Sequence, residues 1–327
     1  MTDATQAAVA APGWHLLSQG ASSAAARTDT LFLAMVLLCG GMALLIGGLL
    51  LFLCIRYREG SKADRSSPSN DSHPLEIAWT VAPVLVFIGV FWWAAHDWWI
   101  ERTVPDGAMV VQVVGKQWMW HLQHANGRRE INALHVPLGR PVVLTMASQD
   151  AIHSFFVPAF RLKQDVVPGR ITRFSFTATR LGEFHIFCAE YCGSEHSAMV
   201  GTLTVMPPAA FSRWLEAGPH EPGVVQQGFA LFRDAGCSGC HGAASTVPAP
   251  PLGGLYGSTV RLADGRTLRA DDDYLRDAIV LPRKDVVAGY PPVMPSYAGR
   301  LDESQLQALI AWMRAGAPSL PDAEDLR

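Results

Sequence analysis

The sequence predicts a multidomain α+β membrane protein in three parts: a hairpin of two transmembrane helices, a β-sandwich or barrel, and a small all-α domain. Two long uncharged runs lie in the first hundred residues, short runs of Val, Thr and Phe follow, and apolar residues at helical spacing end the chain. The 327 residues include 26 Lys and Arg and 29 Asp and Glu, which gives a net charge of −3. No basic surface therefore indicates a nucleic-acid partner. With 49% hydrophobic and 17% charged residues, the composition also excludes a disordered chain.

The two uncharged runs are long enough to cross a membrane. As helices, residues 31–55 would span about 37 Å and residues 77–95 about 28 Å, against a hydrocarbon layer of about 30 Å. The loop between them carries four basic residues: Arg56, Arg58, Lys62 and Arg65. Only Arg27 is basic before the first run, so the loop is expected in the cytoplasm and both termini outside. We expect a hairpin over 31–100 in a bacterial inner membrane, with an exported segment 1–30 and periplasmic soluble domains.

The region 105–207 is predicted to be the β part of the chain. Four of its segments are rich in residues that favour strands: 110–113, 142–145, 173–177 and 201–205. Gly, Pro and Asn-Gly signals separate them, a pattern that is typical of a β-sandwich or barrel. His121 and His124 lie in this region and are expected on a solvated face.

A loop rich in metal-ligand residues lies near the end of this β region. Residues 188–199 contain Cys188, Cys192, His196 and Met199, and His153 lies 35 residues before Cys188. Thiolate, imidazole and thioether groups together suit copper. A single blue-copper site needs one cysteine, whereas two thiolates can bridge two ions and spread one unpaired electron over both. The alternative is a disulfide within this C-x3-C pair in an exported domain.

This loop resembles the binuclear copper A loop of cytochrome c oxidase subunit II, with the pattern C-x-E-x-C-x3-H-x2-M and the upstream histidine in place. The resemblance covers about residues 30–215, and the segments 73–80, 115–120 and 162–170 also match the family. It implies that 105–207 folds as a cupredoxin-like Greek-key β-barrel. Six residues would then bind copper A: His153, Cys188, Glu190, Cys192, His196 and Met199. The cysteines would bridge two coppers, each histidine would bind one, the methionine would be a weak ligand, and the glutamate would contribute its backbone carbonyl.

The resemblance implies roles for three further groups. The Glu190 carboxylate would reach a magnesium site shared with subunit I. Trp118 is similar to the tryptophan through which electrons enter, and its alternative role is core packing. Glu76, at the cytoplasmic end of the second span, resembles the residue at the entrance of a proton path, and its alternative role is that of a solvated interfacial acid.

The chain ends in a separate domain that begins after a linker at 208–223. The motif C-x2-C-H is formed by Cys237, Cys240 and His241, and it is the attachment signal for c-type haem. The two thiols add to the vinyl groups, and the adjacent imidazole is held under the iron. Zinc sites and redox dithiols share the C-x2-C part alone.

The rest of the C-terminal sequence favours haem attachment over a zinc site or a redox dithiol. Residues 224–318 look like a class I cytochrome c domain, with 319–327 as a tail. Met294, which precedes a proline in a loop, is expected to be the sixth iron ligand. Met313 lies at a helical position, where methionine is more often a core residue.

These features together predict a subunit that accepts electrons for a haem-copper terminal oxidase. Electrons would pass from an external donor, cytochrome c or a quinol:cytochrome c reductase, through the fused haem c and copper A to subunit I, where O2 is reduced to water with coupled proton translocation. Subunit III and membrane lipid are further expected partners. The linker would set the reach of the tethered haem. The alternatives are a copper A-containing nitric oxide reductase and a membrane-tethered copper carrier or assembly factor.

Overall fold

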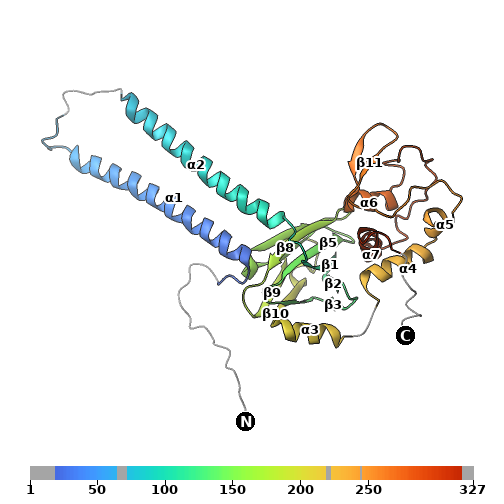
Figure 1. Ribbon diagram of the computed structural model, residues 1–327. Coiled ribbons are helices and arrows are strands. Elements are labelled where there is room, and N and C mark those ends of the chain that lie inside the picture. Colours follow the sequence, from blue (N-terminus) through green and yellow to red (C-terminus); the bar gives the residue numbers. More distant parts are fainter. Residues whose placement is uncertain (1–18, 65–71, 219–221, 244, 319–327) are drawn as a thin grey trace, which may run out of the picture.

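The computed structural model describes residues 19–64, 72–218, 222–243 and 245–318. Four predicted segments lie partly or wholly outside the described residues: 1–18 of the exported segment, 65–71 of the loop expected in the cytoplasm, 219–221 of the linker and the whole tail 319–327. Figure 1 shows two long helices, a β-sandwich and a mainly helical C-terminal domain in chain order. The fold class predicted from the sequence is therefore confirmed.

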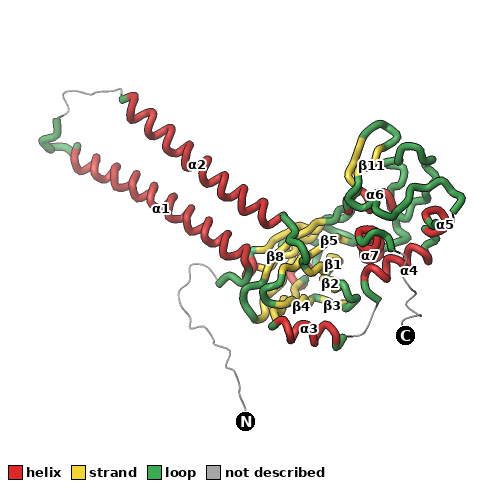
Figure 2. Tube along the Cα trace, viewed as in Figure 1, coloured by secondary structure: helices red, strands yellow, loops and turns green. Residues whose placement is uncertain are grey.

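The two helices are α1 (Ser23–Arg56) and α2 (His73–Arg102), and both extend beyond the uncharged runs that predicted them. They run antiparallel and project away from the β-sandwich (Figures 1 and 2). The most apolar stretch of each helix is 0% buried within the protein. By length and composition both can span a membrane, where a helix satisfies its own backbone hydrogen bonds.

The N-terminal end of α1 is attached to the sandwich. Ser22 caps the helix by accepting a hydrogen bond from the Ala25 N–H, and its hydroxyl donates to the Phe160 carbonyl at 2.8 Å. About two turns further along α1, the Arg161 guanidinium donates two hydrogen bonds to the Asp29 carboxylate, at 2.7 and 3.0 Å. These contacts fix the sandwich relative to the membrane anchor.

The sandwich consists of two five-stranded sheets. The first sheet has the order β3 (Arg129–Ile131), β2 (Met119–His124), β1 (Met109–Lys116), β5 (Pro141–Ser148) and β8 (Thr172–Thr177). The second sheet has the order β4 (Ala133–Pro137), β10 (Val200–Met206), β9 (Gly182–Cys188), β6 (His153–Val157) and β7 (Leu162–Val166). Pairs β1–β5 and β4–β10 are parallel, and the other pairs are antiparallel. Four of these strands contain the four segments predicted from composition.

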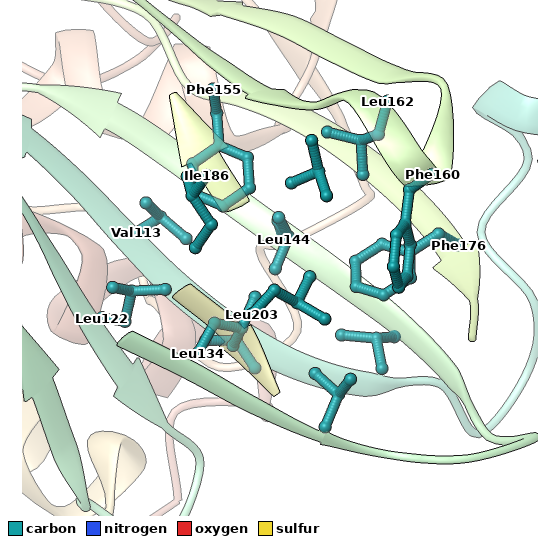
Figure 3. Packing of buried hydrophobic residues seen from close by; sticks show 14 of the residues in the cluster. Val113, Leu122, Leu134, Leu144, Phe155, Phe160, Leu162, Phe176, Ile186 and Leu203 are labelled. Atoms are coloured by element: carbon teal, nitrogen blue, oxygen red, sulfur yellow. The ribbon is translucent and has the colours of Figure 1, made fainter. Parts of the chain in front are cut away.

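The core lies between the two sheets (Figure 3). Val113 and Leu144 point inward from the first sheet and meet Phe155, Ile186 and Leu203 of the second, and all five side chains are 0% exposed. Burying side chains of this size contributes about 1.5 to 3 kcal/mol each. This packed interior holds the loops at the ends of the strands in place.

The C-terminal domain (residues 222–318) follows α3 (Pro208–Glu216). Its helices are α4 (Val224–Asp234), α5 (Ser238–His241), α6 (Asp272–Val280) and α7 (Glu303–Arg314). The domain also contains a hairpin of β11 (Thr259–Arg261) and β12 (Thr267–Arg269). The sequence analysis predicted an all-α domain and did not predict this hairpin. Ala263, Asp264 and Gly265 form its turn, which the Gly265 N–H closes by donating to the Leu262 carbonyl at 3.0 Å, and Gly265 has a positive φ of 89°.

Candidate metal centre and haem-attachment site

The ligand-rich loop joins β9 to β10. Cys188 is the last residue of β9, His196 begins the short 3-10 helix η2 (His196–Ala198), and Met199 directly precedes β10. The Cys188 N–H donates to the Met199 carbonyl at 3.2 Å, which closes the base of the loop. The ladder between two neighbouring strands therefore brings residues eleven apart in sequence together.

The predicted ligand atoms converge on this loop. His153 Nδ1 lies 3.8 Å from Cys188 Sγ, which in turn lies 3.9 Å from Cys192 Sγ. Cys192 Sγ is 3.5 Å from His196 Nδ1 and 3.9 Å from Met199 Sδ. The Glu190 carbonyl oxygen lies 3.3 Å from Cys188 Sγ. The ligand atoms of His153, Cys188 and Cys192 all lie within 4.8 Å of one another.

The two cysteines are free thiols. Their sulfur atoms are 3.9 Å apart, whereas a disulfide bond is about 2.05 Å long. The structure therefore does not adopt the disulfide alternative. Two thiols, two imidazoles and a thioether at this spacing fit a soft or borderline metal such as copper.

Burial and polar contacts set the protonation of the site. Burial alone would raise the pKa of Cys188, but hydrogen bonds with His153 and with backbone groups lower it to about 6. Burial and the charge of Cys188 raise the pKa of Cys192 to about 12. Burial lowers the pKa of His153, but contacts with Cys188 and Asp150 outweigh it and leave that pKa raised. Metal binding would deprotonate both thiols.

Two residues that the sequence analysis missed support the site. Asp150 Oδ1 lies 2.8 Å from His153 Nε2, and Asp150 Oδ2 accepts a hydrogen bond from the Gln117 N–H at 2.8 Å. The Gln117 side chain donates to the Cys192 carbonyl at 2.7 Å. A carboxylate behind a histidine ligand fixes its tautomer and leaves Nδ1 free for the metal. The sequence signal that could have identified Asp150 as a supporting residue is its position three residues before His153.

The three other predicted site residues lie in different surroundings. Trp118 is half-buried, and its Nε1 lies buried without a hydrogen-bond partner in the described chain. Its indole lies 3.2 Å from the position of a Cβ on Gly193, so it packs against the ligand loop. The Glu190 side chain is exposed beside this loop. Glu76 is exposed in the first turn of α2, 3.5 Å from His73.

A buried polar cluster shows that one expectation was wrong. His124 is 1% exposed, because its side chain points inward to Glu130, with His124 Nε2 2.8 Å from Glu130 Oε1. The other Glu130 oxygen lies 2.5 Å from His135 Nδ1, and the His135 ring stacks on Trp214. Burial would raise the pKa of Glu130, but hydrogen bonds from both histidines lower it to about 2.

The C-x2-C-H motif lies in and just before α5. Cys237, Cys240 and His241 line one cavity, and Met294 and Met313 lie on its wall with mostly apolar side chains. His241 Nδ1 lies 2.9 Å from the Pro250 carbonyl, to which it can donate a hydrogen bond. That bond leaves Nε2 free to bind iron. The cavity therefore fits a covalently attached haem with an axial histidine.

The fold and the two sites define a membrane-anchored protein with a candidate copper centre and a candidate haem-attachment site. Three family models match it: "Cytochrome C oxidase subunit II, transmembrane domain" over residues 11–93, "Cytochrome C oxidase subunit II, periplasmic domain" over 129–205, and "Cytochrome c" over 225–317. The chain therefore contains the transmembrane and periplasmic domains of the cytochrome c oxidase subunit II family, followed by a cytochrome c domain. Members of this family are subunits of haem-copper oxidases, which are oxidoreductase complexes.

Individual relatives are similar to parts of the chain. The chain is 29% identical to cytochrome c oxidase subunit 2 of Alkalihalophilus pseudofirmus over 277 residues, 77% of this chain and 78% of the relative. It is 34% identical to the alternative cytochrome c oxidase subunit 2 of Bradyrhizobium diazoefficiens over 145 residues, 35% of this chain and 52% of the relative. A crystal structure of the periplasmic domain of subunit II of cytochrome oxidase of Bradyrhizobium japonicum has a TM-score of 0.34 and 27% identity, covering 36% of this chain and 96% of that domain.

Proposed function

We propose that this chain accepts electrons from an external cytochrome c or a quinol:cytochrome c reductase and passes them through its own haem c and copper A to subunit I. In that subunit O2 would be reduced to water with coupled proton translocation. The observation that supports this best is the convergence of two free thiols, two imidazoles and a thioether on one loop. A carrier that releases copper needs fewer and more exposed ligands than this largely buried set.

Each copper ligand would have a role that suits its position. Cys188 and Cys192 lie at the centre of the set and would bridge two coppers, while His153 and His196 lie on opposite sides and would bind one each. Met199 and the Glu190 carbonyl complete the set. A copper pair bridged in this way would share one unpaired electron, so its geometry would change little on reduction. Asp150 and Gln117 hold His153 and the loop in position.

The haem site has a corresponding division of roles. Cys237 and Cys240 would form the thioether bonds, His241 would bind iron through Nε2, and Met294 would be the sixth ligand. A His/Met pair raises the potential of a haem. The mostly apolar cavity wall would exclude water from a bound haem.

Three further assignments belong to this proposal. The exposed Glu190 carboxylate would bind magnesium together with subunit I, Trp118 would receive electrons beside the copper loop, and Glu76 would lie at the entrance of a proton path. The complex would include subunit III and lie in a bacterial inner membrane. Both termini and the soluble domains would lie in the periplasm.

Metal analysis of the purified full chain, made together with cytochrome maturation proteins, tests this proposal. We expect two coppers for each covalent haem. Cys192→Ser should lose copper and keep the haem, whereas Cys39→Ser, in a span and away from both sites, should keep both. One labile copper, or none, in the unmodified chain would favour the carrier instead. Consumption of O2 but not nitric oxide by the assembled complex would separate the two oxidoreductase alternatives.

A further inference from the structure

Two central strands of the first sheet are buried on both faces. The inward residues of β1 and β5, such as Val113 and Leu144, belong to the sandwich core. The intervening residues point to the opposite, outer face and are also buried, with exposed fractions of 0 to 7%: Gln112, Val114, Val143, Thr145 and Ala147. A sheet of a sandwich normally leaves its outer face to solvent, where polar residues alternate with apolar ones. Another part of the protein must therefore cover this face.

The C-terminal domain contacts this face and its edges. The Gln307 side chain, in α7, approaches the Val113 carbonyl at 3.5 Å, and α7 packs along β1. At the β8 end, the Asp273 carboxylate accepts a hydrogen bond from the Ile171 N–H at 2.9 Å. At the β2 end, the Val224 N–H, in α4, donates to the Ala125 carbonyl at 3.2 Å. Contacts at three separate places fix the orientation of one domain on the other.

The surface that receives the domain is a row of polar side chains. Strand register places Gln123 beside Gln112, Gln112 beside Thr145, and Thr145 beside Arg173, so the row crosses four strands. Polar groups of the C-terminal domain meet both ends of this row. Gln123 donates to Gln227 of α4 at 3.2 Å, and Arg173 pairs with Asp272 of α6.

At the centre of this contact, three buried polar atoms have no hydrogen-bond partner among the described residues. They are the Oε1 atoms of Gln112 and Gln307 and the Oγ1 atom of Thr145. Unpaired buried polar atoms weaken an interface, because water would solvate them if the surfaces separated. Arg173 keeps 33% of its side chain exposed, so dissolved ions can screen its pair with Asp272.

We propose that the outer face of the first sheet is a releasable docking surface for the chain's own C-terminal domain. The polar row of Gln112, Gln123, Thr145 and Arg173 holds the domain in one orientation, and screening of these contacts releases it. Docking, not the length of the linker, then sets the position of the haem-attachment domain relative to the copper loop. In this position α7 faces the sandwich and α5 lies on the side turned away from it (Figure 1). The docked form therefore leaves the α5 side open to an external partner.

Thiol labelling of the purified full chain tests this inference. Val114 and Val113 are neighbours on β1 that point to the outer and inner faces, so Val114→Cys and Val113→Cys are a matched pair. Labelling with a maleimide, followed by peptide mass spectrometry, distinguishes these thiols from the native ones. We expect Val114→Cys to react slowly at low salt and at least about tenfold faster in about 1 M NaCl or with Arg173→Gln, because a local opening exposes it. Val113→Cys should stay protected throughout.

Three outcomes would overturn the inference. Rapid labelling of Val114→Cys at low salt would show that the domain is not docked. Unchanged protection in Arg173→Gln at high salt would show that the polar row does not hold the domain. Parallel labelling of Val113→Cys would show that the sandwich unfolds rather than releasing the domain. The readout does not depend on copper or electron transfer, so it fails independently of the proposed function.

Discussion

Asp150 shows how one residue outside the metal-ligand set can control the candidate copper site. It links His153 Nε2 to the Gln117 backbone, and Gln117 in turn holds the Cys192 carbonyl. We predict that Asp150→Ala lowers copper affinity by about 10- to 100-fold, because the imidazole loses the partner that fixes its tautomer. A competitive chelator titration of the full chain measures this. Asp106→Ala, an exposed aspartate in the loop before β1, should bind copper as tightly as the unmodified chain, and equal losses in both variants would contradict the assignment.

Glu130 gives the sandwich a specific acid sensitivity. Its pKa is lowered from 4.5 to about 2 in the folded protein, mainly by hydrogen bonds from His124 and His135 that outweigh burial. Its stabilising contribution is therefore complete above about pH 4.5 and is lost as the pH falls toward 2. We predict that Glu130→Gln lowers the free energy of unfolding at pH 7 by about 1.5 to 3 kcal/mol and removes this part of the acid dependence.

Thermal unfolding measured from pH 7 down to pH 3 checks this prediction. The control is Glu183→Gln, which changes an exposed carboxylate on β9. It should follow the pH profile of the unmodified chain. A Glu130→Gln profile parallel to that of the unmodified chain would show that Glu130 does not carry the effect.

Site residues that share one motif could be predicted from the sequence. Residues that come together only in the folded chain were harder to predict. Cys188, Cys192, His196 and Met199 lie on one loop, so their spacing alone indicated a metal site. Asp150 lies three residues before His153, and this spacing was a usable signal. The contact of Gln117 with the Cys192 carbonyl joins residues 75 apart in sequence, so no local pattern predicts it. His124 was expected in solvent, because its position gives no sign of the buried Glu130 that binds it.

At the scale of elements, β1 and β5 were predicted from their composition, but their two-sided burial was not. Alternation along a strand predicts one buried face, and only the docked domain explains the second. The β11–β12 hairpin was also missed. Its strands are only three residues long each, too short for a hydrophobic pattern, although the Asp264-Gly265 turn was a usable signal.

The crossing of α4 and α7 depends on a glycine. A Cβ at Gly228 would lie 2.1 Å from the Ala308 carbonyl oxygen and 2.7 Å from the Trp312 Cβ, so the helices cannot keep their present distance with a larger residue. We predict that Gly228→Ala destabilises the C-terminal domain by about 1 to 3 kcal/mol. Chemical denaturation followed by haem absorbance measures it. Gly253→Ala, where the nearest atom lies 3.9 Å away, should change stability little, and similar losses in both would contradict this account.

At the scale of the whole molecule, the order of the three parts could be predicted from the sequence, but their arrangement could not. Uncharged runs, strand-rich segments and the C-x2-C-H motif each carry a local signal. The contact of the C-terminal domain with the first sheet depends on which residues strand register places side by side, such as Thr145 beside Arg173. The sequence analysis expected the linker to set how far the tethered haem can reach. In our proposal, docking of the C-terminal domain sets the position of the haem instead.

The central claim is that the loop from Cys188 to Met199, with His153, holds two coppers as one electronic unit. Copper EPR of the full chain, loaded with copper and carrying its covalent haem, tests this most directly. We predict hyperfine structure shared equally over two copper nuclei, because Cys188 and Cys192 would bridge both. Hyperfine structure from a single copper nucleus, or the absence of any copper signal in the oxidised protein, would contradict it.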